Sequence, residues 1–141
     1  MAPALHSVLH MEDVAPAVLA VDDDADLLAT YCRLLSPHGY RVVMALSRAS
    51  GLVAVERERP RLVIADLRLR DGDGLDVVRA ARQQVPPVPV IVVSGVIDER
   101  SRRAAQAVGV SAFLPKPFET TALVELVRTY VPIPPPTGGL H

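Results

Sequence analysis

Four positions far apart in the sequence carry side chains suited to chemistry on a phosphoryl group. They are a run of acids that begins at Asp22, a single acid at Asp66, the hydroxyl of Ser94 and the ammonium of Lys116. Carboxylates bind hard divalent cations, whereas a hydroxyl and an ammonium bind anionic oxygens. A carboxylate can also act as the nucleophile toward phosphorus. If the fold brings these groups together, they can hold a metal ion and a phosphoryl group at one site.

The acids by themselves predict a bound cation. Asp22 and Asp23 placed near Asp66 would repel one another and raise one another's pKa unless a cation lay among them. Oxygen ligands without histidine or cysteine favour Mg²⁺ over zinc. The plain alternative is that the acids after residue 21 only cap a helix.

Lys116 is the only lysine of the chain, because fourteen of the fifteen basic residues are arginine. Lysine offers a compact ammonium on a flexible stem, whereas arginine spreads its charge over a planar fork. The lone lysine therefore indicates a position that requires a point charge, although an incidental surface lysine is the plain alternative.

The elements that must position these groups are short apolar strands alternating with amphipathic helices. The predicted strands are 18–21, 41–45, 62–65, 88–93 and 112–114. The predicted helices are 27–35, 47–58, 75–81, 98–108 and 119–131. This alternation predicts a doubly wound α/β fold, with one parallel sheet covered by helices on both faces.

Three of the four candidate groups directly follow a predicted strand and Lys116 stands one residue further on, and doubly wound folds place their sites beyond the carboxyl ends of their strands. Taken singly, each group has a purely structural explanation. For example, Ser94 could be a loop residue, and the Gly95 that follows it could simply turn the chain. Their joint placement at four strand ends favours a site. In the loop after Asp66, we expect Gly72 and Gly74 to supply left-handed turn geometry and Asp73 to cap the next helix.

Length and charge exclude several classes of protein. The chain has 141 residues, which suits one domain, and its net charge of −1 gives no general attraction to nucleic acid or anionic lipid. Its one cysteine, Cys32, excludes an internal disulfide and a cysteine-based zinc site and indicates a small buried side chain in a reducing compartment. The most apolar stretch, 88–97, is far shorter than the roughly 20 residues that span a bilayer. We therefore expect a cytoplasmic protein.

Three regions are expected along the chain. Residues 1–16 form a flexible N-terminal extension, residues 17–131 form the domain, and residues 132–141 form a Pro/Gly-rich tail or linker. The four histidines lie outside the group of candidate residues, and we interpret them as solvated.

The motifs VDDD, LVIADLRLRDGDGLDVV, VIVVSG and AFLPKPF stand in an order and spacing that resemble the receiver domain of two-component response regulators. The resemblance spans about residues 17–131. It implies a flavodoxin-like, five-stranded parallel sheet in the order 2-1-3-4-5 with five helices. It also implies a signalling domain that catalyses only its own phosphorylation and dephosphorylation.

The resemblance assigns roles to individual residues. Asp66 matches the phosphoryl acceptor, and Mg²⁺ or Mn²⁺ would be bound by Asp22, Asp23, Asp66 and the backbone carbonyl of Arg68. Lys116 matches the lysine that contacts the phosphoryl group.

Two further positions match the switch of the family, and one peptide bond matches its backbone. Ser94 matches the switch hydroxyl and Phe113 the switch aromatic. The Lys116–Pro117 bond is cis in the family, whereas only about 5–6% of X–Pro bonds are cis in folded proteins.

The chain also departs from the family pattern. Arg70 stands where the family usually has proline, and Pro115 before Lys116 is an uncommon choice. Arg68 and Val96 occupy the positions where the family tunes dephosphorylation, and their size predicts slow loss of the phosphoryl group.

The implied partners are a sensor histidine kinase or a histidine phosphotransfer protein, together with a downstream effector or a second copy that binds through residues 98–131. No direct contact with nucleic acid or a membrane is expected. One alternative is a phosphatase or phosphotransferase of the haloacid dehalogenase type, with Asp22 and Asp24 as its Asp-x-Asp pair. Another is a receiver-like binding module that is never phosphorylated.

Overall fold

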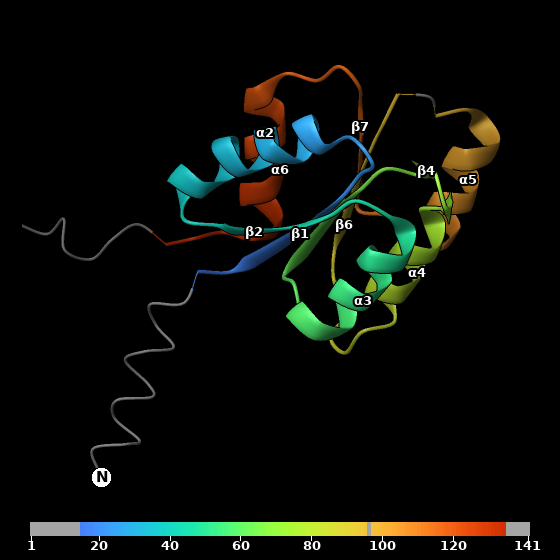
Figure 1. Cartoon of the computed structure of the whole chain (residues 1–141), viewed down its shortest axis with the longest axis horizontal. Helices are drawn as coiled ribbons and strands as arrows, with labels where there is room; N and C mark the ends of the chain where they lie inside the picture. Colours follow the sequence, from blue (N-terminus) through green and yellow to red (C-terminus); the bar gives the residue numbers. More distant parts are fainter. Residues whose placement is uncertain (1–14, 96, 135–141) are drawn as a thin grey trace, which may run out of the picture.

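The five-stranded parallel sheet lies at the centre of the computed structural model, which describes residues 15–95 and 97–134 (Figure 1). Its strand order is β2-β1-β3-β6-β7. The bounds are β1 Ala17–Val21, β2 Arg41–Ala45, β3 Leu62–Ala65, β6 Val90–Ser94 and β7 Ala112–Pro115. This is the predicted 2-1-3-4-5 order of a flavodoxin-like fold.

Five α-helices cover the sheet, as predicted, with α2 and α6 on one face and α3, α4 and α5 on the other (Figure 1). Their bounds are α2 Ala25–Leu35, α3 Arg48–Glu58, α4 Leu75–Arg82, α5 Glu99–Ala107 and α6 Thr120–Tyr130. A short 3₁₀ helix, η1 Ser36–His38, follows α2. None of the helices in the described segments is long and apolar enough to cross a membrane.

Two cores lie on opposite faces of the sheet, and strand β1 contributes to both. Val18 and Ala20 belong to the core under α2 and α6, whereas Leu19 and Val21 belong to the core under α3, α4 and α5. Every residue of β1, β3 and β6 is buried. Burial on both faces explains why these strands are continuous apolar runs without polar alternation.

The fourth strand of the sheet begins at Val90, two residues later than predicted. Val88 does not join the sheet because its N–H donates to the carbonyl of Ala81 at the end of α4, 3.0 Å away. The Lys116–Pro117 bond is cis, as the resemblance implied, and a second cis bond at Val85–Pro86 was not predicted.

A small two-stranded hairpin in the loop after Asp66 was not predicted. Its strands are β4 Arg68–Leu69 and β5 Gly72–Asp73, and residues 70 and 71 form the tip. Gly72 has a φ of +149°, as its predicted role requires.

The expectation of left-handed geometry at Gly74 is wrong, since its φ is −62°. Glycine is required there for another reason, because a Cβ would overlap the backbone carbonyl of Asp66. Asp73 is not the N-cap of α4 as predicted, since Gly74 holds that position without a side-chain cap bond, but Oδ1 of Asp73 accepts from the N–H of Leu75, the first residue of the helix, at 2.9 Å.

The predicted terminal regions lie mostly outside the described residues. In the described part of the tail, Ile133 still packs against the core under α2 and α6. Just before it, the hydroxyl of Tyr40 donates to the carbonyl of Val131 at 2.6 Å. Of the histidines, His38 is described and is exposed, whereas His6, His10 and His141 lie outside. Cys32 is half-buried instead of buried.

We expect Gly74→Ala to lower the free energy of unfolding by about 1–3 kcal/mol, since the added methyl group meets backbone atoms that cannot turn away. The matched control is Gly95→Ala, because a Cβ at Gly95 has no atom within 4 Å. Urea unfolding followed by circular dichroism measures both. Equal unfolding midpoints for the two variants would contradict the close approach at Gly74.

Candidate functional site

The carboxyl ends of four neighbouring strands bring the predicted residues to one edge of the sheet. Asp22 follows β1, Asp66 follows β3, Ser94 ends β6 and Lys116 follows β7. The first three are buried although they are polar. The N–H of Lys116 donates to the carbonyl of Ser94 at 2.9 Å, which extends the pairing of β6 and β7 by one bond.

The ammonium of Lys116 joins two of the acids. Its Nζ lies 2.8 Å from Oδ2 of Asp22 and 2.8 Å from Oδ2 of Asp66. The Lys116 side chain is 25% exposed, whereas the two carboxylates are only 2% and 10% exposed. The lone lysine of the sequence therefore supplies the charge that these buried acids face.

The pKa values of this group follow from burial and charge together. Burial raises the pKa of Asp22 more than the hydrogen bonds from Lys116 and from the N–H of Asp24 lower it. For Lys116, burial acts to lower the pKa, but the hydrogen bonds to Asp22 and Asp66 and the charges of these acids outweigh it and raise the pKa. Lys116 is therefore held as a cation beside a carboxylate whose ionisation the fold disfavours.

The remaining acids after β1 have different partners. Oδ1 of Asp24 accepts hydrogen bonds from the N–H groups of Asp26 and Leu27, at 3.0 and 3.2 Å, and so caps α2. Asp24 is thus occupied at a helix start, which does not suit the Asp-x-Asp pair of the dehalogenase alternative. Asp23 is half-buried, and its Oδ2 accepts from the N–H of Arg70 at 3.1 Å.

The β4–β5 hairpin closes the acidic end of the site. The N–H of Arg68 donates to Oδ1 of Asp66 at 3.0 Å, so the hairpin bonds Asp66 through residue 68 and Asp23 through residue 70. Sequence reasoning missed these two N–H donors, because backbone groups have no signature in the residue types.

The donors here suit a hard cation. Within residues 15–95 and 97–134, no three histidine, cysteine, aspartate or glutamate side chains are grouped so that they could hold a metal ion, and Lys116 lies between Asp22 and Asp66. Beside the hairpin, the oxygen donors are the carboxylates of Asp23 and Asp66. Both accept hydrogen bonds from the hairpin, which also carries the carbonyl of Arg68. Such a set of oxygens fits Mg²⁺, which commonly uses one or two carboxylates.

Of the two predicted switch residues, Ser94 is the last residue of β6 and Phe113 lies within β7. Ser94 is buried, and the space beside Gly95 is open. The ring of Phe113 is partly buried against the core under α5, and the guanidinium of Arg102 from α5 lies 4.5 Å from its centroid. Val96, one of the residues predicted to slow dephosphorylation, lies outside the described residues, whereas Arg68 is exposed.

Tyr31 lies within the predicted helix 27–35, and its hydroxyl is in an unusual environment. Its ring stacks on Phe118 with centroids 6.1 Å apart, and its hydroxyl has no hydrogen-bond partner within the described residues. Burial raises its pKa, and the charges of Asp22 and Asp66 raise it further. No sequence signal distinguishes this tyrosine from any other apolar helix position.

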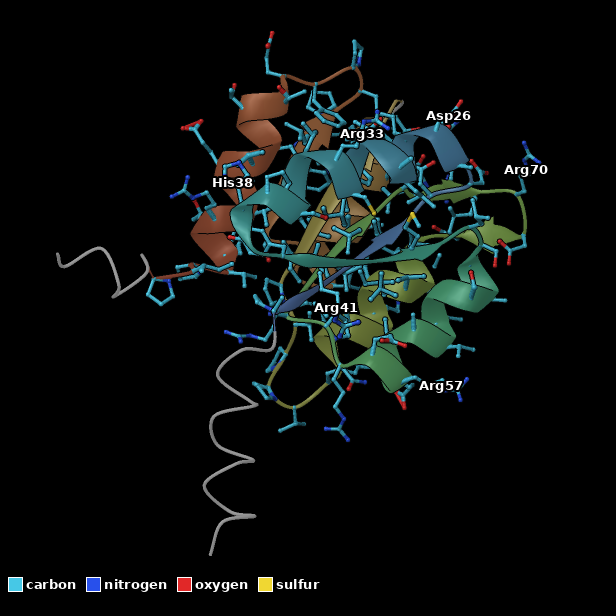
Figure 2. All side chains as sticks on the ribbon, turned by 60° about the vertical axis from the view of Figure 1, so that its left-hand side comes forward. Asp26, Arg33, His38, Arg41, Arg57 and Arg70 are labelled. Carbon is cyan, nitrogen blue, oxygen red and sulfur yellow. The ribbon has the colours of Figure 1, made fainter. Side chains whose placement is uncertain are left out.

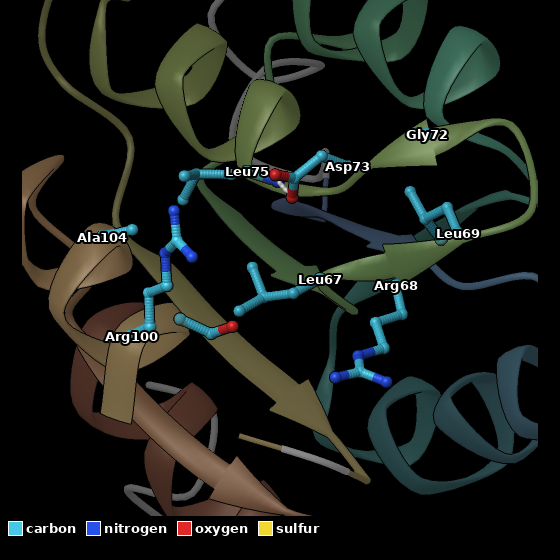
Figure 3. A pocket seen from close by; sticks show the side chains of 9 residues that line it. Leu67, Arg68, Leu69, Gly72, Asp73, Leu75, Arg100 and Ala104 are labelled. Carbon is cyan, nitrogen blue, oxygen red and sulfur yellow. Dashed lines mark hydrogen bonds between the residues drawn. The ribbon is translucent and has the colours of Figure 1, made fainter. Parts of the chain in front are cut away.

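A pocket of about 470 Å³ lies beside the site, between the hairpin and α5 (Figure 3). Leu67, Leu69 and Leu75 provide apolar lining, while Arg68 and Arg100 approach from the hairpin and from α5. The ion-paired acids and Lys116 do not line this pocket. The pocket is therefore a neighbour of the site and not its centre.

Comparison with known sequences gives a consistent result. The chain matches the response regulator receiver domain over residues 18–128. The photosynthetic apparatus regulatory protein RegA of Rhodovulum sulfidophilum is 33% identical over 122 residues, which are 86% of this chain and 67% of that protein. The transcriptional regulatory protein GlrR of Escherichia coli K12 is 37% identical over 110 residues, which are 78% of this chain but only 25% of GlrR. The chain therefore spans only part of these relatives.

Solved structures agree with the sequence comparison. The CheY-like response regulator receiver domain protein of Methanospirillum hungatei JF-1 has a TM-score of 0.78 at 27% identity, covering 82% of this chain and 93% of that chain. The receiver domain of an HD domain-containing protein from Pseudomonas fluorescens Pf-5 also has a TM-score of 0.78, at 26% identity, with coverages of 84% and 95%.

We expect Asp22→Asn, measured in EDTA, to raise the urea midpoint of unfolding at pH 7. Because the folded-state pKa of Asp22 is raised, the fold binds its proton more tightly than the unfolded chain does, and ionisation at neutral pH disfavours the fold. The asparagine cannot ionise. Its advantage should shrink as the pH falls through the pKa of Asp22, since the wild-type carboxyl is then protonated. A midpoint at pH 7 no higher than that of the wild type would contradict this, and Asp26→Asn on the exposed start of α2 is the control.

Proposed function

This chain belongs to the response regulator receiver domain family, which works in two-component phosphorelay signalling, and on that basis we propose that Asp66 accepts a phosphoryl group from a phosphohistidine donor. The observation that carries the proposal is the contact of one ammonium, Lys116, with Asp66 and Asp22 at 2.8 Å each. This contact supports the proposal, because a charge that can bind a phosphoryl oxygen lies beside the proposed acceptor.

In the proposed reaction a carboxylate oxygen of Asp66 attacks phosphorus in line. The new O–P bond forms while the P–N bond to the donor imidazole breaks, and the imidazole leaves with the electron pair and takes up a proton. Lys116 exchanges its contact with the Asp66 carboxylate for one with a phosphoryl oxygen and keeps its contact with Asp22. The domain catalyses this step and the hydrolysis of its own aspartyl phosphate.

Receiver domains generally bind Mg²⁺ at an acidic pocket. In this chain we assign the metal to Asp22, Asp23, Asp66 and the carbonyl of Arg68, with Mn²⁺ as an equivalent ion. When bound, the metal would neutralise charge on the phosphoryl oxygens. Asp22 contributes mainly by holding Lys116, whereas Asp23 and Asp66 offer carboxylate oxygens beside the hairpin.

The output is proposed to be a change of surface. Ser94 would move toward the phosphoryl group, and Phe113 would turn into the space that it leaves. This alters the face formed by residues 98–131, through which the domain would bind an effector or a second copy. Because this is a shift between two states, the phosphoryl group must favour one of them. The phosphoryl donor would be a sensor histidine kinase or a phosphotransfer protein, and the setting would be the cytoplasm.

Incubation with acetyl phosphate and Mg²⁺ tests the acceptor. We expect the wild type to gain one phosphoryl group, detected by intact mass, that is stable to acid and labile to base. Asp66→Asn should gain none, because the amide is a poor nucleophile. Asp26→Asn, which changes an exposed acid of α2, should behave as the wild type. Phosphorylation of Asp66→Asn at the wild-type rate would refute the assignment.

A second test keeps the positive charge at position 116 and changes the shape of the side chain. Lys116→Arg keeps the positive charge but replaces an ammonium that contacts two carboxylates at 2.8 Å by a larger planar group. We expect the phosphorylation rate with acetyl phosphate to fall at least tenfold, which is about 1.4 kcal/mol in the barrier. An unchanged rate would show that only the charge at this position matters.

A further inference from the structure

The tip of the β4–β5 hairpin is bonded to α3. Oδ1 of Asp71 accepts from the N–H of Arg48 at 2.8 Å, and Oδ2 accepts from the N–H of Ala49 at 3.0 Å. The side chain of Arg48 continues the connection, since its Nε lies 2.8 Å from Oδ2 of Asp76 in α4. The hydrogen bonds from Ala49 and Arg48 lower the pKa of Asp71, so its carboxylate is charged at neutral pH.

Helix α3 has a side-chain cap of its own besides the bonds to Asp71. Ser47 caps it, accepting from the N–H of Ser50 at 3.0 Å, and the hydroxyl of Ser50 accepts from the N–H of Ser47 at 3.1 Å. This reciprocal capping box stabilises the first turn without help from another element. The capping box leaves the N–H groups of Arg48 and Ala49 without a partner in their own helix, and Asp71 accepts from both, so these two bonds join the hairpin tip to the first turn of α3.

The neighbouring tip residue bonds to the acidic site. The N–H of Arg70 donates to Oδ2 of Asp23, whereas the Arg70 side chain projects into solvent (Figure 2). One residue of the tip thus orients a carboxylate of the proposed metal site, and the next residue anchors the tip to α3. Proline, which lacks an N–H, could not make the bond to Asp23.

The hairpin is too small to hold this position by itself. Its strands have two residues each, and the two pairs are Arg68 with Asp73 and Leu69 with Gly72. Isolated two-stranded hairpins are at best marginally stable in water. The place of the Arg68 carbonyl and of the Arg70 N–H therefore depends on what the hairpin is bonded to.

We propose that Asp71 is a positioning residue of the metal site, which acts by fixing the hairpin tip to the start of α3. The inference rests on the proposed function, because it concerns the ion assigned there to Asp22, Asp23, Asp66 and the carbonyl of Arg68. Asp71 does not touch the ion. It sets the geometry of two of the groups that do.

Mn²⁺ binding to the unphosphorylated chain, measured by electron paramagnetic resonance, tests the proposal without any phosphoryl transfer. We expect Asp71→Ala to weaken binding about tenfold, the lower end of what loss of a supporting contact costs in metal affinity. Asp71→Asn keeps one acceptor oxygen and should fall between Asp71→Ala and the wild type. Asp26→Ala removes an equal charge from an exposed position and should bind as the wild type does.

The outcomes separate this inference from the function on which it rests. If the wild type binds Mn²⁺ and Asp71→Ala binds it equally well, the role of Asp71 is refuted and the proposed function stands. If Asp71→Asn and Asp26→Ala weaken binding as much as Asp71→Ala, the effect is one of net charge and the positioning role is again refuted. If the wild type binds no Mn²⁺, the metal assignment itself fails, and this inference fails with it.

Amide hydrogen exchange supplies a readout that does not involve metal. Asp71→Ala should speed exchange at the N–H groups of Arg48, Ala49 and Arg70, while the capped N–H of Ser50 stays as protected as in the wild type. Unchanged exchange at Arg70 would show that the tip keeps its place without Asp71 and would overturn the proposal.

Discussion

The structure depends on the burial of two carboxylates beside one ammonium. Asp22 and Asp66 are held at the ends of adjacent strands, and the charge that faces them comes from Lys116, 94 and 50 residues away along the chain. Removing the ammonium from such a group would leave two buried carboxylates without a compensating charge. The parallel sheet can place these residues together because the carboxyl ends of its strands meet at one edge. The fold and the site are therefore stabilised by different forces, apolar burial within the sheet and charge pairing at its edge.

The same arrangement explains why the loops at this edge are so closely bonded. The loop after β3 must pass Asp66 closely enough that Gly74 has no room for a Cβ, and its hairpin donates backbone N–H groups to both Asp66 and Asp23. Carboxylates that accept such bonds are fixed in orientation as well as in charge. The acidic end of the site is thus ordered by main-chain groups, while its basic end is ordered by one long side chain.

The fold was predictable because strand burial and helix periodicity determine which residue types occur at each position. The runs 18–21 and 62–65 are apolar throughout, and in the structure both are buried on their two faces. The acids and Lys116 were predictable as a group because each follows such a run. Features that depend on backbone contacts were not predictable. The hairpin tip is the main example, since nothing in the sequence around Arg70 and Asp71 indicates which residues they bond to. The error at Gly74 has the same origin, because glycine serves a positive φ and a close approach equally well.

The contact between Arg102 and Phe113 has a consequence for how a binding partner would distinguish two forms of this surface. In the described structure the ring is a platform for a guanidinium, 4.5 Å from its centroid, on the side of the molecule formed by α5 and β7. If the ring turned inward, this cation–π contact would be lost, and the guanidinium of Arg102 would be free to move and to become hydrated. The two forms would then differ in the location and hydration of a positive charge as well as in shape. An acidic partner could respond to that difference without touching the aromatic ring.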